Sequence, residues 1–190
     1  MLRLTSGSFK GRSILTPAHL KTRPTQAKLR QALFNSIQAI TPEARVLDLF
    51  AGSGSLGFEA LSRGASEVVF VEISASVAKL IEKNAESLGV MDKVRVLVGS
   101  IDSYKETLHR LGPFDLVLAD PPYGMGWELK LIQGFSWDTL LSEDGVFCFE
   151  WGEGQGQLKE LPESGPFLVK IREKHYGDSR LTTFKLKPGP

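Results

Sequence analysis

One apolar run in the chain ends in a way that strongly constrains the fold. Residues 114–119 read Phe-Asp-Leu-Val-Leu-Ala, and Asp120, Pro121 and Pro122 follow directly. The length and composition of this run are typical of a buried parallel strand. Proline has no N–H group for the hydrogen-bond ladder of a sheet, so the strand has to end here. The sequence therefore predicts that Asp120 lies at the carboxyl end of a central strand, the edge at which open α/β sheets bind ligands.

Similar runs recur along the chain and alternate with segments of helical periodicity. We expect strands at residues 45–50, 67–72, 94–98, 114–119 and 145–151, a loop at 152–156, and an antiparallel pair at 167–176 and 181–186. We expect helices at residues 26–40, through 58–61 up to Gly64, at 76–88, at 104–111, and at 127–141 with a break at Gly134. This alternation predicts an α/β fold with a doubly wound, mostly parallel sheet that closes with an antiparallel C-terminal strand. We expect a single domain, residues 1–190, with a short N-terminal extension, residues 1–44, before a Rossmann-like core, residues 45–190.

Composition narrows the class of protein. The single cysteine, Cys148, excludes an internal disulfide framework, and its apolar neighbours predict a buried thiol. No spacing of cysteine and histidine suggests a metal site, and no apolar run reaches the roughly 18 residues of a membrane-spanning helix. The first residues lack the apolar core of a signal peptide. We expect a cytoplasmic protein without a metal ion.

The net charge of +1 hides an uneven distribution. Residues 1–45 contain eight Lys or Arg and one acidic residue, whereas the rest of the chain contains 15 basic and 21 acidic residues. A basic end on an acidic body favours a polyanionic partner, although a solvated surface can have the same composition.

We expect a hairpin or flexible arm at residues 1–20 and an extended linker at 21–25, because a proline at position 24 disfavours a helical residue before it. The basic candidates for contact with nucleic acid in this part of the chain are Lys10, Arg12, Arg23, Lys28 and Arg30.

The residues from Asp120 to Tyr123 suit the transfer of a group to an exocyclic base amine. The lone pair of such an amine is delocalised into its ring, which makes the amine a poor nucleophile. The carboxylate of Asp120 and the carbonyl of Pro121 can each accept one N–H hydrogen bond and leave the lone pair facing an electrophile. Pro121 and Pro122 hold the carbonyls rigidly, and Tyr123 offers a ring on which a flipped base can stack. A plain strand-ending turn is the alternative interpretation.

A glycine-rich turn at residues 51–57, Ala-Gly-Ser-Gly-Ser-Leu-Gly, follows the first core strand and opens a helix. Glu72 ends the next strand, where a carboxylate can accept hydrogen bonds from both hydroxyls of a ribose. NAD sites share this pattern, so the glycines do not distinguish NAD from S-adenosylmethionine. Two features favour S-adenosylmethionine. A pyrophosphate would be repelled by Asp48 inside the strand, and hydride transfer has no use for the motif at 120–123.

Ser100 and Ile101 follow the strand at 94–98. They would flank an adenine ring, Ile101 by apolar contact and Ser100 by a hydrogen bond. An ordinary loop is the alternative interpretation of this pair.

With these residues in place, the chain resembles the class I methyltransferases and, more narrowly, the bacterial RsmD family, which methylates the exocyclic amine of a guanine in 16S ribosomal RNA. The resemblance covers nearly the whole chain and rests on segments 7–12, 20–37, 46–57, 59–65, 120–123 and 176–178. It implies that S-adenosylmethionine is held by Asp48, Phe50, Gly52, Gly54 and Glu72. We expect Ala51, Ile73, Ser100, Ile101 and Asp120 to contact the cofactor as well. The resemblance also implies that Asp120, Pro121, Pro122 and Tyr123 hold the guanine amine, and that Arg23, Pro24 and Thr25 border the entrance to the site. The chain departs from the family pattern at Gln26-Ala27, where Asp-Arg is usual, and at Ser100, where an acid or amide is usual.

The leading hypothesis is therefore S-adenosylmethionine-dependent methylation of a guanine N2 amine in 16S ribosomal RNA, by a monomer that acts on a small subunit or an assembly intermediate. Methylation of an adenine N6 amine in DNA or RNA is the nearest alternative, since the same motif suits any such amine. A non-catalytic RNA-binding factor and an NAD-dependent oxidoreductase are alternatives from other classes.

Overall fold

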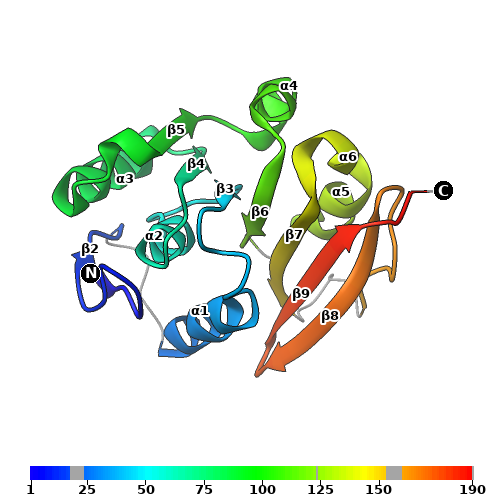
Figure 1. The fold of residues 1–190 in the computed structure, drawn as a ribbon, viewed down its shortest axis with the longest axis horizontal. Coiled ribbons are helices and arrows are strands. Elements are labelled where there is room, and N and C mark those ends of the chain that lie inside the picture. The colour runs from blue at the N-terminus through cyan, green and yellow to red at the C-terminus, as the bar shows by residue number, and fades with distance from the viewer. Residues whose placement is uncertain (18–23, 123, 153–159, 190) are drawn as a thin grey trace.

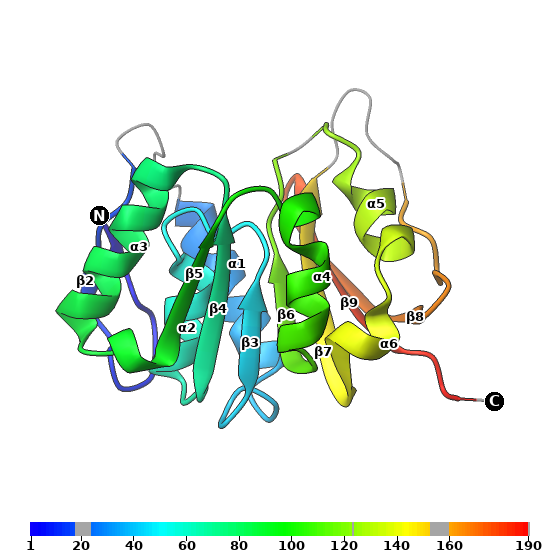
Figure 2. The ribbon, with the colours of Figure 1, turned by 90° about the horizontal axis from the view of Figure 1, so that it is seen from above.

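The computed structural model describes residues 1–17, 24–122, 124–152 and 160–189, and its main feature is a seven-stranded sheet with helices on both faces (Figure 1, Figure 2). The strand order is β5-β4-β3-β6-β7-β9-β8. β3, β4, β5, β6 and β7 are parallel, and β9 runs antiparallel to both of its neighbours. The strands are β3 (Arg45–Asp48), β4 (Glu67–Glu72), β5 (Val94–Val98), β6 (Phe114–Ala119), β7 (Leu141–Gly152), β8 (Leu168–Tyr176) and β9 (Ser179–Leu186). A 3₁₀ turn, η1 (Met91–Lys93), precedes β5.

Side chains of the central strands alternate between two apolar cores because both faces of the sheet are buried. Val46 and Leu116 belong to one core, and their neighbours Leu47 and Val117 belong to the other. The first core, called here the α1-side core, includes residues of α1 (Pro24–Ser36), α2 (Ser55–Ser62) and α3 (Ala75–Leu88). The α4-side core includes residues of α4 (Ile101–Leu111), α5 (Trp127–Gly134) and α6 (Trp137–Leu140). Figure 1 shows α1 and α2 below the sheet and α4, α5 and α6 above it.

The N-terminal segment, residues 1–17, packs against α2 and α3. Its strands β1 (Leu2–Arg3) and β2 (Ser13–Ile14) form a small antiparallel sheet. The Ser62 hydroxyl on α2 accepts a hydrogen bond from the N–H of Phe9 at 2.9 Å. Asn84 on α3 exchanges two hydrogen bonds with the backbone of Leu15, at 2.7 and 3.0 Å. Polar side chains of the helices thus form hydrogen bonds with backbone groups of this segment that no neighbouring strand pairs.

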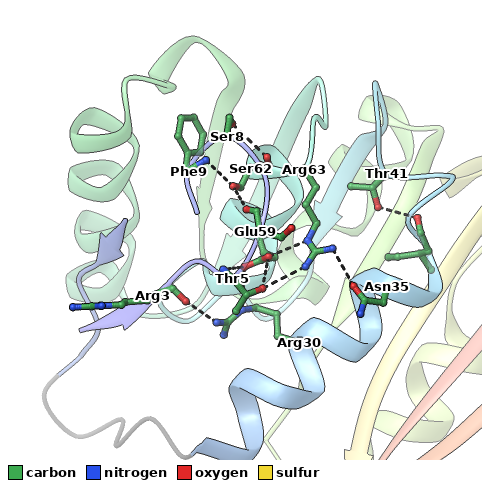
Figure 3. A network of polar contacts seen from close by, with 12 residues as sticks. Arg3, Thr5, Ser8, Phe9, Arg30, Asn35, Thr41, Glu59, Ser62 and Arg63 are labelled. Carbon is green, nitrogen blue, oxygen red and sulfur yellow. Dashed lines mark hydrogen bonds and ion pairs between the residues drawn. The ribbon is translucent and has the colours of Figure 1, made fainter. Parts of the chain in front are cut away.

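Glu59 of α2 is the centre of the polar network that anchors the N-terminal segment (Figure 3). Its side chain is 0% exposed, and its carboxylate accepts hydrogen bonds from the N–H and hydroxyl of Thr5 at 2.8 and 2.6 Å. Arg63 lies 2.9 Å from one carboxylate oxygen and Arg30 of α1 lies 3.4 Å from the other. Arg30 also donates to the carbonyl of Arg3 at 2.9 Å. One buried carboxylate therefore joins the N-terminal segment to both α1 and α2.

Several predicted elements are confirmed. β4, β5 and β6 have the predicted bounds, the C-terminal antiparallel pair is present, and the helical stretch after residue 126 breaks at Gly134. The predicted hairpin near the N-terminus forms from β1 and β2. The thiol of Cys148 is buried, which raises its pKa to about 12. Residues 153–156 of the predicted loop and residues 21–23 of the predicted linker lie outside the described residues. None of the described helices is both long and apolar enough to cross a membrane.

The bounds of α1 correct the predicted linker and helix. α1 begins at Pro24, two residues earlier than expected, because proline is well suited to the first position of a helix. It ends at Ser36 rather than residue 40. The chain then tightens into turns in which the carbonyl of Ile37 accepts bonds from the N–H groups of Ile40 and Thr41, at 3.0 and 3.1 Å. Ile37 remains in the core, so the apolar periodicity continued past the helix itself.

α4 and β7 begin three and four residues earlier than predicted. α4 begins at Ile101 instead of residue 104, because the Ser100 side chain caps it by accepting a hydrogen bond from the N–H of Ser103 at 3.2 Å. β7 begins at Leu141 instead of residue 145. The register of its pairing with β6 shifts after Phe114. The first part of β7 therefore does not continue the apolar run from which the strand was predicted.

Candidate active site

A cavity of about 630 Å³ opens at the carboxyl edge of the sheet. It lies where the strand order reverses between β3 and β6, the position at which doubly wound sheets bind ligands. The loops after β3, β4, β5 and β6 line it, together with Glu150 of β7. Leu2, Thr16 and Leu29 close it from the N-terminal segment and α1. The volume is in the range of sites for small ligands and cofactors.

The loop after β3 exposes its backbone to this cavity. Phe50, Ala51 and Gly52, which were predicted to hold the cofactor, all line it. Gly52 has a φ of 52°, and a Cβ built there would meet no atom within 4 Å. A ligand could therefore approach the backbone closely at Gly52.

The next two glycines of the turn serve packing instead. Gly54 caps α2 in the left-handed conformation, with φ 78°, and a Cβ there would lie 2.7 Å from the ring of Phe58. A Cβ at Gly57 would lie 2.2 Å from the ring of Phe70. Gly54, which the resemblance placed at the cofactor, does not line the cavity. These glycines allow α2 to approach the sheet closely.

Glu72 ends β4 and faces the cavity, as predicted. Its carboxylate accepts hydrogen bonds from the N–H groups of Gly52 and Ser74, both at 2.8 Å. A carboxylate has about four acceptor sites, so two of them fix its position and the others can accept hydroxyl groups of a ligand. Ile73, the next residue, lines the same wall and is 75% exposed.

Asp48 supports the glycine turn from behind the cavity. It is 1% exposed and is not among the cavity-lining residues, although the resemblance placed it at the cofactor. Its Oδ2 accepts a hydrogen bond from the N–H of Gly57 at 3.1 Å, and Oδ1 has no partner among the described residues. Burial raises the pKa of Asp48 to about 7; the Gly57 hydrogen bond opposes this effect, and the charges of Asp120 and Glu72 add to it. Asp48 thus ties α2 to β3 at the base of the cavity.

Ser100 and Ile101 line the cavity after β5, but both also belong to the start of α4. The Ser100 hydroxyl caps that helix, so any hydrogen bond that it makes to a ligand competes with the cap. Ile101 is buried in the α4-side core. Both residues follow β5, where they were expected, and in the structure they form part of the cavity wall.

Asp120, Pro121 and Pro122 form the wall that follows β6. Asp120 makes no hydrogen bond with the described residues and is only partly buried by neighbouring atoms. Burial raises the pKa of its carboxyl to about 6, so the group is mostly charged at neutral pH. Its acceptor sites are therefore available to a donor in the cavity. Tyr123, which was predicted to stack on a base, lies outside the described residues.

Met125, Trp127 and Glu150 are among the lining residues that were not predicted. The ring of Trp127 packs edge-on against Phe50, with centroids 5.0 Å apart, and so joins the walls after β3 and β6. Glu150 had the same sequence signal as Glu72, because each is an acidic residue near the carboxyl end of a predicted strand. Trp127 and Met125 had no such signal, since nothing in the sequence shows that their loop folds over Phe50.

The basic residues of the N-terminal region that were predicted to contact nucleic acid differ in burial and in their partners. Arg30 was predicted to contact nucleic acid, but it is only 3% exposed and its guanidinium is paired with Glu59. It supports the N-terminal segment through Arg3 and Glu59 and also lines the cavity, so its contact with nucleic acid stays a prediction. Arg12 is exposed and donates to the carbonyl of Ser87 at 2.7 Å. Lys10 and Lys28 are exposed. Arg23 lies outside the described residues, and Pro24 and Thr25 begin α1.

Known proteins are similar to this sequence over most of its length. It matches the family described as "Conserved hypothetical protein 95" over residues 2–185. YlbH of Bacillus subtilis strain 168 is 33% identical over 185 residues, which are 97% of this chain and 98% of that protein. Ribosomal RNA small subunit methyltransferase D of Escherichia coli strain K12 is 35% identical over 162 residues, covering 85% of this chain and 79% of that protein.

Comparison with solved structures identifies the same group of proteins. The solved structure of yhhF from Escherichia coli superposes with a TM-score of 0.82 at 29% identity and covers 98% of both chains. The family match leaves only a few residues at the ends unmatched, and YlbH aligns nearly end to end. We conclude that the chain belongs to the RsmD family of class I, S-adenosylmethionine-dependent methyltransferases.

Proposed function

We propose that the protein transfers a methyl group from S-adenosylmethionine to the exocyclic N2 amine of a guanine in 16S ribosomal RNA. One observation carries this proposal: a single cavity has Gly52 and Glu72 on one wall and Asp120, Pro121 and Pro122 on another. The first wall suits a nucleoside with two ribose hydroxyls, and the second suits a planar amine. Two reactants held on these walls would meet inside one cavity, which favours their reaction.

Phe50, Gly52, Glu72 and Ile73 are the residues that would hold the cofactor. The open backbone at Gly52 and the remaining acceptor sites of Glu72 fit a nucleoside. The carboxylates that line the cavity also favour a cationic ligand over one with a pyrophosphate. S-adenosylmethionine supplies an electrophilic methyl group on a positively charged sulfonium.

Asp120 and Pro121 would orient the amine. The charged carboxylate of Asp120 and the carbonyl of Pro121 would each accept one N–H hydrogen bond, which leaves the nitrogen lone pair for the methyl group. Asp120 does not have to be a strong base, because the nitrogen loses its proton readily once the methyl group is attached. Most of the rate acceleration would come from position and from fixed polar groups.

A ribosomal RNA substrate is supported by the name of the Escherichia coli relative and by exposed basic residues such as Lys10 and Lys28. A guanine inside folded RNA has to be turned out of its stack to reach a cavity of this kind. The shape of the folded RNA would supply much of the recognition.

A methyl-transfer assay with identified nucleosides tests the proposal. Protein is incubated with methyl-labelled S-adenosylmethionine and with small ribosomal subunits from a strain that lacks this gene, and the RNA is then digested. We expect label in N2-methylguanosine from 16S ribosomal RNA, and none with the Asp120→Ala variant. Label in N6-methyladenosine would replace guanine by adenine as the target. Cofactor binding without label in any nucleoside would favour a non-catalytic RNA-binding protein.

A further inference from the structure

The C-terminal hairpin, formed by β8 and β9, is strongly basic. Residues 167–190 contain six Lys or Arg and only two acidic residues. The acidic excess elsewhere in the chain hides this cluster when charge is counted over residues 46–190 as a whole. Because strand residues alternate between faces, the register of the hairpin shows how these charges are divided between the two sides of the sheet.

Three of the basic residues lie on one side of the hairpin. Tyr176 packs against the α1-side core, so Lys174 and Arg172, two and four residues before it on β8, share its side. On β9, Leu181 belongs to the same core, which places Lys185, four residues later, on that side as well. We call Arg172, Lys174 and Lys185 the cationic face.

The register shifts between Lys170 and Arg172, so Lys170 pairs with Phe184 of the α4-side core and lies on the opposite side of the hairpin. The cations on that side are neutralised. Lys170 lies 2.7 Å from a carboxylate oxygen of Glu163, and Arg180 lies 3.4 Å from one of Glu173. The three side chains of the cationic face, by contrast, make no ion pair or hydrogen bond to any residue that the structure describes. Arg172 and Lys174 are exposed and Lys185 is partly exposed. The two sides therefore differ in free charge although the hairpin sequence is basic throughout.

The cationic face is continuous with the cavity. Glu150 of β7 lines the cavity and pairs with Leu181 of β9, which in turn pairs with Lys174 of β8. Neighbouring strands lie about 4.8 Å apart, so Lys174 lies about 10 Å from the cavity wall at Glu150. All three residues are on the same side of the sheet. Figure 1 shows the hairpin at the end of the sheet opposite to α3 and β5.

We infer that the cationic face binds the phosphate backbone of the RNA whose base enters the cavity. The inference rests on the proposed function, since it takes RNA as the substrate. Three free cations, of which Lys174 lies two strands away from Glu150, suit a backbone that runs outward from a flipped nucleotide. The N-terminal region has fewer free cations than its sequence suggests, because Arg30 is buried in an ion pair and Arg45 is paired with Glu67.

Edge strands offer a different explanation for these charges. β8 is at the edge of the sheet, and lysines on an edge strand discourage pairing with another chain. If that were their only effect, their removal would promote self-association and leave RNA binding unchanged. The following experiment measures both properties.

The test compares two triple variants with equal loss of charge. Arg172→Gln, Lys174→Gln and Lys185→Gln remove the cationic face. Arg95→Gln, Lys79→Gln and Lys83→Gln remove the same residue types from exposed positions on β5 and α3, at the opposite end of the sheet. Affinity for the 16S ribosomal RNA of small subunits is measured over a series of salt concentrations, together with S-adenosylmethionine binding and the sedimentation of each protein.

We expect the first variant to bind RNA at least about 10-fold more weakly near 100 mM salt, with the slope of log affinity against log salt reduced by about 2. The control should bind within about 2-fold of the unmodified protein, and all three proteins should bind S-adenosylmethionine equally. Equal RNA affinity of the two variants would overturn the inference, as would self-association of the first variant with unchanged RNA affinity. If the unmodified protein binds RNA through this face but forms no N2-methylguanosine, the proposed function fails and the binding surface stands.

Discussion

On the wall of the cavity formed after β3 and β4, carboxylates are tied to the backbone, whereas on the wall after β6 Asp120 is not. Glu72 accepts two backbone hydrogen bonds at 2.8 Å, and Asp48 accepts one from Gly57 at 3.1 Å. Asp120 accepts none from the described residues. The prolines that follow it fix the backbone without using the carboxylate. The first wall is thus held by its acidic side chains, and the second is held by its backbone.

This difference separates two properties that a mutation can affect. A carboxylate that holds the backbone contributes to the folded state, and its removal should lower stability or distort a binding surface. A partly buried carboxylate with no partner opposes folding, because it has lost hydration without a hydrogen bond in return. Such a group is expected where a substrate supplies the missing donor. Asp120 fits that description, and Glu59 is the clearest opposite case outside the cavity.

Asp120→Ala should have the largest effect on activity. We expect the turnover number to fall by about 10²–10³-fold, since one positioned acceptor for the amine is lost. The dissociation constant of S-adenosylmethionine should stay within about 2-fold, because the cofactor would be held mainly by the opposite wall. Methyl transfer to small-subunit RNA and titration calorimetry measure the two quantities.

The matched control for this prediction is Asp144→Ala, which removes an exposed carboxylate far from the cavity and should leave both values unchanged. Asp120→Asn should also fold at least as stably as the unmodified protein at pH 8. A clear loss of thermal stability in Asp120→Asn would show that Asp120, too, holds the structure.

Glu59→Gln should have the largest effect on stability. Arg30 would stay buried without its counter-charge, and Thr5 and Arg63 would lose an ionic acceptor. We expect the free energy of unfolding to fall by about 3–5 kcal/mol, as measured in urea. The amide of Thr5 should exchange faster with solvent, because its acceptor holds the N-terminal segment.

Glu67→Gln is the control for Glu59→Gln. It breaks an ion pair with Arg45 in which both side chains are about half exposed, at 45% and 40%. Pairs of this kind contribute about 1 kcal/mol or less. Equal effects of the two substitutions would contradict the importance of burial in the Glu59 network.

Glu72→Gln should weaken cofactor binding by about 10-fold or more. A glutamine side chain can accept from only one of Gly52 and Ser74 while its NH₂ group faces the other N–H. The open backbone at Gly52 would therefore shift. Titration of S-adenosylmethionine into the variant measures the effect, with Glu82→Gln on the exposed face of α3 as the control. An unchanged dissociation constant would exclude Glu72 from the cofactor site.

The sequence was sufficient to predict most of the fold and the positions of two acidic residues in the candidate site. Short apolar runs such as residues 114–119 predict parallel strands, and the ends of those strands locate Glu72 and Asp120. The distinction between a residue that lines a cavity and one that supports it was not predictable. Asp48 precedes the glycine-rich turn and Gly54 lies within it, yet both face the packing between α2 and the sheet.

Charge was harder to interpret than apolar pattern. The excess of basic residues in the first 45 positions predicts a nucleic-acid surface, but Arg30 and Arg45 are used in ion pairs. The free cations of the C-terminal hairpin were missed, because only the register of β8 and β9 separates Arg172 and Lys174 from the paired Lys170 and Arg180. A count of charge along the chain does not show which charges are already neutralised.

The smallest expected effect is a dependence on pH that separates Asp120 from Asp48. Burial raises the pKa of Asp120 to about 6, so methyl transfer should fall by half near pH 6 as the acceptor becomes protonated. Burial raises the pKa of Asp48 to about 7, above its value in the unfolded chain. The folded state then binds a proton that the unfolded state does not, so unfolding free energy should fall as pH rises through 7. Asp48→Asn should weaken this dependence of stability while the activity profile keeps its midpoint near 6. If the activity midpoint instead moved with Asp48→Asn by as much as the stability profile did, Asp48 rather than Asp120 would set the pH dependence of activity, and the contrast between the two walls of the cavity would not hold.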